Sequence, residues 1–572
     1  MAAKYPFRMR IKILLIGLIS LLTFQTAFAS TLEDEFHAQT ILNEVRQSQK
    51  YQNPVVFMVS GIANSFNDSI ATVLYTQPGA VELGETRARW QGCTSPSDPI
   101  CDLTKEGPSG KPGKFDMISS VILPVCKTEK EENCIESLEI AYGKEDFSNA
   151  KFLRQIQTEY TLNADTETGF PGGSAVALWD DSTAKNSKSL SYMTNVSYEL
   201  HRNAGGKFYI NGINFVIKPY IEVSGNYRAP YFNQQSGTYS AIGMRNSREV
   251  WTENGKAGIQ KQFILDSKFR LKVRSTNNVS GWFKGRIKNP EISINEFSPK
   301  NNIITIEGSP VKVPTFAYTK NGAQLTPKEF QWQQSNGGSG DLAGGMGLTT
   351  PANSDQWDIF DYIEYFRPLA EDKVVGYYTL WSVNSTTWGN DNYCLRDTNR
   401  VLGIVSTNAM GYNGNSPEYK DGTINYKVAG MHYEPDGKGL VEGTYDLLMR
   451  SDAARCLYGF SNAPVQATIS VTGDNEQKVA VTSMTEGNGW IKLSAYGFNF
   501  SSPTIRVQLS QVKPEVPKVE VPKVESQPAT TNTAAAQTQT IIKKKSLTCI
   551  KGKVTKKVSG TNPKCPAGFK KK

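Results

Sequence analysis

The sequence predicts a mainly β protein built from antiparallel β-sandwich or immunoglobulin-like regions. Short runs alternate apolar and polar residues with a period of two, as in FRLKVR, where Phe269, Leu271 and Val273 alternate with basic residues. Dipeptides typical of tight turns separate such runs. Regular short strands with these turns favour sandwiches or Greek-key barrels over parallel α/β folds. The turn dipeptides are Asn211-Gly212, Asn321-Gly322, Asp421-Gly422, Asp436-Gly437 and Asn488-Gly489.

Residues 1–29 have the pattern of a secretory signal peptide. Four basic residues precede an apolar stretch at 13–22, and Ala27-Phe28-Ala29 forms a small-x-small cleavage site. An uncleaved membrane anchor is the alternative. No other run approaches the roughly 18 apolar residues of a transmembrane helix. We therefore expect export, and no transmembrane segment after cleavage.

A short amphipathic helix is predicted over residues 30–50. Ser30 or Thr31 can cap its start, and acidic residues fill the first turn. Its apolar side is formed by Leu32, Phe36, Ile41, Leu42 and Val45.

Three folded regions are expected after this helix. Residues 51–290 form a large β-region, and residues 371–511 form a β-sandwich domain. Residues 291–370 form a bridging region with a Gly-rich loop, NGGSGDLAGGMG, and a helix candidate, DQWDIFDYIEYF. Residues 512–542 are rich in Pro, Thr and Ala and predict a disordered linker. A basic tail, residues 543–572, ends the chain.

Charge is divided unevenly along the chain. The first 29 residues carry four positive charges and the last 30 carry eleven, all lysine, with no acidic residue. Because the whole chain totals +9, residues 30–542 have a net charge of −6. The basic pI therefore belongs to the ends, and sequence-specific nucleic-acid binding by the body is not expected.

The eight cysteines predict disulfides, because their number is even and export is expected. Locality favours Cys93–Cys101, Cys126–Cys134, Cys394–Cys456 and Cys549–Cys565. A swap among the first four is the main alternative. No CxxC pair is present and the three histidines, His37, His201 and His432, are scattered, so we expect neither a metal nor a cofactor.

Known catalytic motifs are missing from the sequence, including GxSxG, HExxH, the Walker loop and the Rossmann fingerprint. Paired carboxylates need separate attention because a glycosidase requires only two acids. Asp358, Asp361 and Glu364 would share a helix face, and Asp180 and Asp181 follow a strand. Solvated surface positions are the alternative for both sets. No catalytic residue is assigned, and His201 and His432 are expected to have packing or loop roles.

Aromatic residues give the better binding signal. Tyr227 and Tyr231 flank Arg228 in GNYRAPYF, and Trp381 and Trp388 lie near Asn and Thr in TLWSVNSTTW. Flat rings beside amides and hydroxyls suit sugars. These four residues are candidate glycan contacts, and burial in a β-sandwich core is the alternative.

The basic tail predicts a small cysteine-closed hairpin that turns at Lys551-Gly552-Lys553. Clustered lysines attract phosphates by releasing counterions, without reading sequence. A solvated lysine tail is the alternative. The expected anion-binding residues are Lys543, Lys544, Lys545, Lys551, Lys553, Lys556, Lys557, Lys564, Lys570, Lys571 and Lys572.

The tail sequence SLTCIKGKVTKKVSGTNPKCPAGFKKK closely resembles a C-terminal tail shared by secreted surface proteins of planktonic actinobacteria. GTYDLLMRSDAARCLYGFSNAPVQATISV, GWIKLSAYGF and SSPTIRVQLS, together with GWFKGRIKNPEISI and IEGSPVKVP, are similar to the same group. The resemblance thus covers much of the mature chain. It implies a surface location and supplies no catalytic residue.

Together these observations predict an exported cell-surface protein. We expect a non-catalytic binding, adhesive or envelope-structural body, with a cationic tail that contacts anionic envelope polymers or headgroups. A secreted polysaccharide-active enzyme and a tethered solute or glycan receptor are the alternatives.

Overall fold

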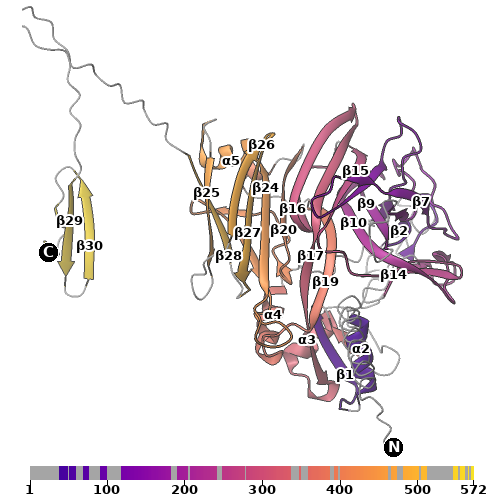
Figure 1. The fold of residues 1–572 in the computed structure, drawn as a ribbon, viewed down its shortest axis with the longest axis horizontal. Helices are drawn as coiled ribbons and strands as arrows, with labels where there is room; N and C mark the ends of the chain where they lie inside the picture. The colour runs from indigo at the N-terminus through magenta and orange to yellow at the C-terminus, as the bar shows by residue number, and fades with distance from the viewer. Residues whose placement is uncertain are drawn as a thin grey trace, which may run out of the picture. The chain divides into compact units, whose positions relative to one another are not determined.

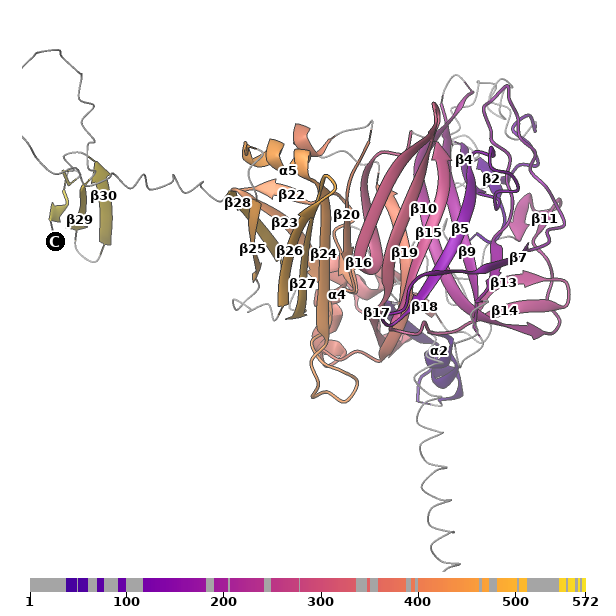
Figure 2. The same cartoon turned by 45° about the horizontal axis from the view of Figure 1, so that its top comes forward.

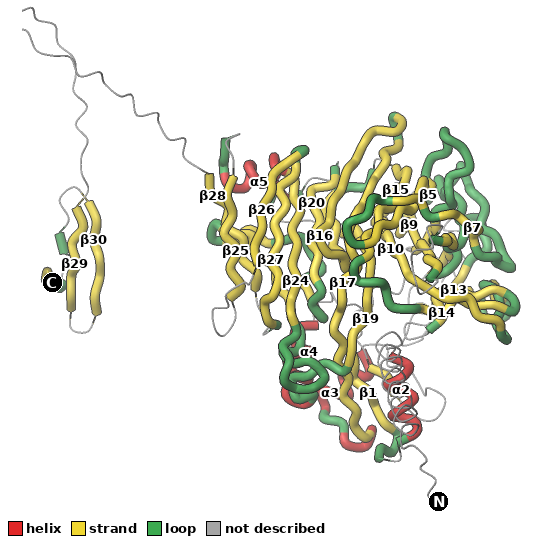
Figure 3. Tube along the Cα trace, in the orientation of Figure 1, coloured by secondary structure: helices red, strands yellow, loops and turns green. Residues whose placement is uncertain are grey.

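The chain forms two compact units, residues 1–512 (the body) and 513–572. The computed structural model describes residues 38–48, 50–59, 69–76, 91–98, 117–181, 190–203, 206–240, 248–276, 278–335, 347–349, 359–386, 392–396, 400–461, 465–472, 481–500 and 504–511, and in the second unit 545–551, 554–560, 564–565 and 568–571. Strands dominate, with a few short helices (Figure 3), so the mainly β prediction is confirmed. The predicted signal peptide and linker lie outside the described residues.

Two packed layers of strands form the N-terminal part of the body (Figures 1 and 2). FRLKVR lies in β15 and has the predicted alternation, with Phe269, Leu271 and Val273 buried. One layer contains β6 (Ser148–Asn149), β5 (Cys134–Tyr142), β15 (Ser267–Thr276), β17 (Asn301–Asn321) and β16 (Gly281–Ser298). The other contains β3 (Gln91–Gly92), β2 (Val73–Thr76), β4 (Met117–Ile122), β9 (Ser191–Arg202), β10 (Phe208–Ser224), β8 (Ala177–Asp180), β7 (Lys151–Gln155), β14 (Lys256–Gln260) and β13 (Glu249–Glu253).

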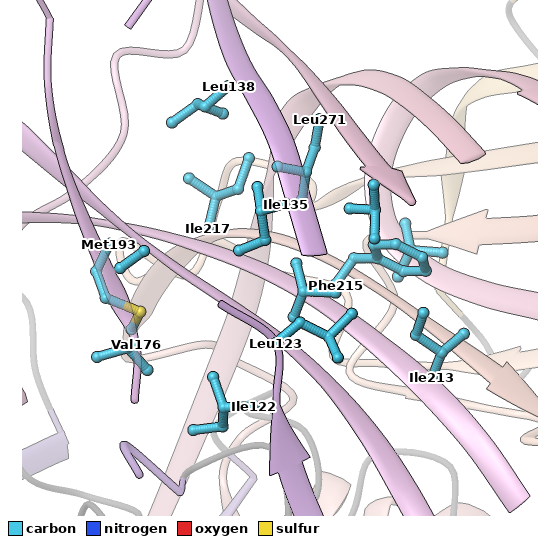
Figure 4. Packing of buried hydrophobic residues seen from close by; sticks show 14 of the residues in the cluster. Ile122, Leu123, Ile135, Leu138, Val176, Met193, Ile213, Phe215, Ile217 and Leu271 are labelled. Carbon is cyan, nitrogen blue, oxygen red and sulfur yellow. The ribbon is translucent and has the colours of Figure 1, made fainter. Parts of the chain in front are cut away.

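The core of this part lies between the two layers. Figure 4 shows Ile135, Leu138 and Leu271 from one layer near Phe215 and other residues of the second layer. All four of these residues are fully buried. Burial of such side chains stabilises a fold by about 1.5–3 kcal/mol each.

A second sandwich forms the C-terminal part of the body. One layer continues the large sheet from β10 and β16 through β19 (Gly376–Thr386), β20 (Val401–Thr407), β24 (Glu442–Arg450), β27 (Trp490–Asn499) and β26 (Val481–Gly487). The facing sheet contains β21 (Gly411–Tyr412), β22 (Glu418–Lys420), β23 (Thr423–Ala429), β28 (Thr504–Gln511) and β25 (Val465–Thr472).

The two sandwiches share strands, and each shared strand serves two cores. Neighbouring residues of a strand point to opposite faces of its sheet. Accordingly, Phe283 of β16 and Leu448 of β24 belong to the N-terminal core. Their neighbours Trp282 and Leu447 belong to the C-terminal core. The predicted boundaries at residues 290 and 370 therefore do not separate compact units. Strand β16 runs through residue 290. Strand β19, which follows residue 370, pairs with the earlier strands β10, β16 and β17.

Helices α2 (Ala38–Gln47), α3 (Pro327–Ser335) and α4 (Ile359–Leu369) lie at one end of the body, and α5 (Ser451–Tyr458) lies at the other (Figure 1). In α2, Ile41 and Val45 pack against Val56 and Met58 of β1 (Pro54–Val59), which confirms the predicted N-terminal helix over its described part. The helix predicted in DQWDIFDYIEYF is present as α4. Two further helices, α3 and α5, were not predicted. Smaller elements are β11 (Tyr231–Asn233), β12 (Thr238–Ser240), β18 (Gly347–Thr349) and the 3-10 turns Gly322–Gln324 and Tyr393–Leu395.

The turn dipeptides have different outcomes. Asp421-Gly422 and Asn488-Gly489 form two-residue hairpin turns with positive φ at both positions, as predicted. Asn211-Gly212 does not form a turn. It lies inside the 17-residue strand β10, where the pairing with β9 shifts register between Ile210 and Gly212. An Asn-Gly pair is thus accommodated here by a β-bulge.

The basic tail contains a three-stranded antiparallel sheet. Strand β29 (Lys545–Lys551) pairs with β30 (Val554–Gly560), and Lys551 stands opposite Val554. Strand β31 (Lys570–Lys571) pairs with the other edge of β29. The predicted hairpin is therefore present, with a third short strand added by the end of the chain.

Candidate functional site

A pocket of about 450 Å³ opens on the N-terminal part of the body, beside the end of β7. Segments 71–72, 155–158, 160–162 and 173–175 form its walls. Isolated bridges join Ala71 to Ala175 and Leu162 to Gly173, so chain segments about a hundred residues apart hold it together. Its volume is within the ~300–1,000 Å³ typical of small-molecule sites.

Thr72 organises the floor of this pocket. Its hydroxyl lies 2.9 Å from the Ser174 carbonyl oxygen and accepts from the Ile122 amide at 3.0 Å. The Gln155 carboxamide donates to Ser174 Oγ at 2.5 Å and to the Ala175 carbonyl at 2.9 Å. A Cβ at Gly173 would lie 2.1 Å from Thr72 Oγ1, so this close approach requires glycine.

Tyr160 supplies the aromatic wall. Its hydroxyl donates to the Thr72 carbonyl at 2.9 Å, and its ring centroid lies 4.9 Å from that of Tyr239. Burial, with Tyr239 and Tyr75 nearby, raises the pKa of Tyr160 above the ordinary phenol value. The hydroxyl therefore remains a hydrogen-bond donor at neutral pH, and the ring is fixed in position.

The loop that carries Tyr227 and Tyr231 lies beside this wall. The Glu159 amide donates to the Pro230 carbonyl at 2.8 Å, and Arg228 bonds the Glu159 carboxylate at 2.8 Å. That bond lowers the pKa of Glu159. Arg228 also stands 3.7 Å from the centre of the Tyr231 ring, so it covers one face of the ring. Tyr227 is half-buried and leans over Gly225.

The two predicted tryptophans do not join this region. Trp381 is 1% exposed, and its indole N–H donates to the Gly308 carbonyl at 2.9 Å. The prediction of glycan contact is therefore wrong for Trp381, which packs in the N-terminal core. Trp388 lies outside the described residues.

The candidate carboxylates are not brought together as a catalytic pair. Asp180 is exposed, whereas its neighbour Asp181 is buried and accepts from the Tyr142 hydroxyl at 2.7 Å. Asp361 and Glu364 are exposed on α4, and Glu364 lies 3.6 Å from Arg367. Asp358 lies outside the described residues. None of the described acids lines the pocket.

Two histidines have acidic partners. His432 bonds Asp372 through both its backbone amide and Nδ1, which clamps the chain between α4 and β19 to the segment before β24. His201 lies 3.0 Å from Glu199. Burial opposes ionisation of Glu199, but hydrogen bonds from His201 and Asn211 outweigh it and lower the pKa of this carboxyl. These contacts agree with the expected loop and packing roles. His37 lies outside the described residues.

Two predicted disulfides, Cys126–Cys134 and Cys394–Cys456, are confirmed. Cys93 and Cys565 are also disulfide-bonded. Cys101 and the side chain of Cys549 lie outside the described part, so Cys93–Cys101 and Cys549–Cys565 stay predictions.

Six tail lysines belong to the small sheet: Lys545, Lys551, Lys556, Lys557, Lys570 and Lys571. Lys564, Lys570 and Lys571 are exposed. Lys543, Lys544, Lys553 and Lys572 lie outside the described residues. Pairing places Lys556 opposite Cys549, and Lys571 on the other side of Cys549. The backbones of Lys556 and Lys571 are therefore held about two strand spacings apart, on either side of β29.

Sequence patterns missed the pocket entirely. Thr72, Gln155 and Ser174 belong to three separate segments and form no recognisable motif. The nearest signal was GNYRAPYF, which identified the neighbouring loop but not Tyr160.

Comparisons with protein-family models, with curated proteins and with solved structures found no match to this chain. Within the described segments, no helix has the length and apolar character needed to cross a membrane.

Proposed function

We propose that this protein is exported and held at an anionic cell envelope by its basic tail, while its body acts as a binding or structural module. The observation that carries the proposal is the separation of charge. Eleven lysines and no acidic residue occupy residues 543–572, against a net charge of −6 for residues 30–542. An anionic polymer would be repelled by the body and attracted by the tail.

Strand pairing strengthens this argument. A disordered lysine tail spreads its charge along the chain, whereas β29, β30 and β31 hold six lysines between residues 545 and 571 in one three-stranded sheet. The disulfide at Cys565 supports so small a unit, which has little hydrophobic core of its own. The ligands that this charge favours are phosphate-bearing envelope polymers, because phosphate binding to lysine clusters releases counterions.

The test compares four forms of the mature protein on immobilised polyphosphate. We expect the full chain to bind and to elute with added NaCl, with a logarithmic slope of ~0.7–0.9 per phosphate contacted. A chain truncated after residue 542 should not bind. Replacing the six strand lysines by glutamine should weaken binding strongly, and replacing them by arginine should preserve it.

The same variants are then expressed in a bacterial host with an anionic cell wall. The truncated and glutamine forms should appear in the medium, and the full chain and arginine form should stay with the cells until salt is added. Retention of the truncated form on the cells, resistant to salt, would overturn the tail-anchor proposal. The enzyme alternative is not proposed, since Asp180 and Asp181 differ in exposure and the described acids of α4 lie on its exposed side.

A further inference from the structure

The pocket beside β7 is neutral. Among its described lining residues none carries a charge, and besides Tyr160 six offer hydroxyl or carboxamide groups: Thr72, Gln155, Gln157, Thr158, Thr161 and Ser174. Two acids within or beside the segment 155–162 are already paired. Glu159 binds Arg228, and Glu253 binds Arg154 and the Gln157 amide. A charged ligand would find no opposite charge on this wall to compensate for its lost hydration.

The polar groups of the pocket fall into a fixed floor and an adjustable rim. The floor consists of Thr72, Gln155 and Ser174, and it is held, like the Tyr160 wall, by the hydrogen bonds described above. The rim includes Gln157 and Thr161, which are both exposed. A fixed floor lowers the entropic cost of binding, and a rim of amide and hydroxyl groups can donate and accept.

The pocket also has an aromatic side chain, that of Tyr160. Tyr160 is half-buried, lines the pocket and is immobilised through its hydroxyl and through Tyr239. Sugars combine apolar C–H faces with many hydroxyls, and a fixed aromatic ring beside neutral donors and acceptors matches both. Tyr231 is less suited to this role, because Arg228 already covers one face of its ring.

We propose that this pocket binds a neutral sugar unit of a polysaccharide, with Tyr160 as the ring contact and Gln155, Gln157 and Thr161 as hydrogen-bonding partners. The proposal deepens the binding role of the body proposed above. It does not depend on the tail, so failure of one leaves the other standing. The pocket is an open cleft at the surface, which allows a longer chain to pass over it.

The test measures binding of defined probes to the full mature chain by isothermal titration calorimetry. The neutral probes are maltohexaose, cellohexaose, laminarihexaose and chitohexaose. An oligogalacturonate represents anionic sugars, and adenosine represents nucleosides. We expect at least one neutral hexasaccharide to bind and the oligogalacturonate and adenosine not to bind.

Variants then locate the site. Gln157→Ala and Thr161→Ala should each weaken binding of that hexasaccharide about two- to tenfold, the effect of one lost hydrogen bond. Thr161→Trp, at an exposed rim position, should fill the mouth and abolish binding without changing the melting temperature. Gln334→Ala, an exposed glutamine on α3, is the matched control and should bind like the unmodified chain.

Three outcomes would overturn the proposal. The first is that no neutral hexasaccharide binds. The second is that binding occurs but Thr161→Trp and Gln157→Ala leave it unchanged, which would place the sugar elsewhere. The third is that adenosine or the oligogalacturonate binds and competes at these residues.

Discussion

The two cores of the body lie on opposite faces of shared strands and differ in how they meet solvent. The N-terminal core reaches a surface of paired charges and a neutral pocket; Arg270, for example, bonds both Glu139 and Glu307. The C-terminal core is closed by the buried side of α4 and lies next to the disulfide Cys394–Cys456. The difference places the pocket proposed above as a sugar site in the N-terminal sandwich, whereas α4 covers the core of the C-terminal one.

Neighbouring residues of β16 allow the two cores to be weakened separately. Replacing Trp282 or Phe283 by alanine should each reduce the free energy of unfolding by about 3–5 kcal/mol, because a large buried ring is lost. Hydrogen exchange should show which side responds. We expect Trp282→Ala to accelerate exchange mainly in β28, and Phe283→Ala mainly in β9.

Glu296→Ala is the control on the same strand, since Glu296 is exposed, and it should change stability by less than about 0.5 kcal/mol. If both ring variants accelerated exchange equally in β28 and β9, the two cores would have to be one cooperative unit.

The two confirmed disulfides, one in each part of the body, should contribute different amounts to the free energy of unfolding. Cys394 and Cys456 are 62 residues apart, whereas Cys126 and Cys134 are 8 apart. In the chain-entropy model, replacing each pair by alanine should cost about 4 and about 2.5 kcal/mol, respectively. Urea unfolding of the two double variants measures both values. A larger loss for the short loop would show that loop entropy does not set the order.

Two buried carboxyls should give opposite pH responses. Burial raises the pKa of Asp446, and the donors Ser494, Tyr496 and the Asn289 amide only partly offset it. Burial also opposes ionisation of Glu139, but hydrogen bonds from Lys272 and Arg270 outweigh it and lower its pKa.

The sign of each contribution follows from these directions. The stability from Glu139 is present above the ordinary carboxyl pKa of about 4.3 and is lost as the pH falls through its folded value. The stability from protonated Asp446 is present below about 3.9 and is lost as the pH rises through its folded value. We therefore measure urea midpoints between pH 3 and 8. Glu139→Gln should abolish the part of the stability loss at acid pH that comes from Glu139, and Asp446→Asn should abolish the part of the stability loss toward neutral pH that comes from Asp446. Glu296→Gln should leave the pH dependence of stability unchanged. If Glu139→Gln and Asp446→Asn changed that pH dependence in the same direction, these assignments would be contradicted.

Local patterns predicted the elements well where one face is buried. The alternation in FRLKVR gave β15, and Asp421-Gly422 gave a hairpin, because strand period and turn φ are local properties. Helix α3 also had a local signal. Thr326-Pro327-Lys328-Glu329 is a capping box with proline at the first helical position, and Thr326 and Glu329 bond each other reciprocally.

Other features depend on partners far along the chain. Asn211-Gly212 looks like a turn, but pairing with β9 and β19 carries β10 straight through it. Trp381 looks like a surface ring in sequence, yet Gly308 and the N-terminal core enclose it. Strand pairing likewise runs across residue 290, since β16 pairs with β17 on both sides of it and with β19 and β20 before it.

The sequence by itself determined the β-rich build, the charge division, the tail hairpin and two of the disulfides, because these depend on periodicity, residue type and short separations. Only the tertiary structure decided the sharing of strands between the two cores and the assembly of the pocket. Thr72 and Ser174 are brought together across 102 residues by strand pairing, and such pairing is selected by the burial of whole faces rather than by any local pattern.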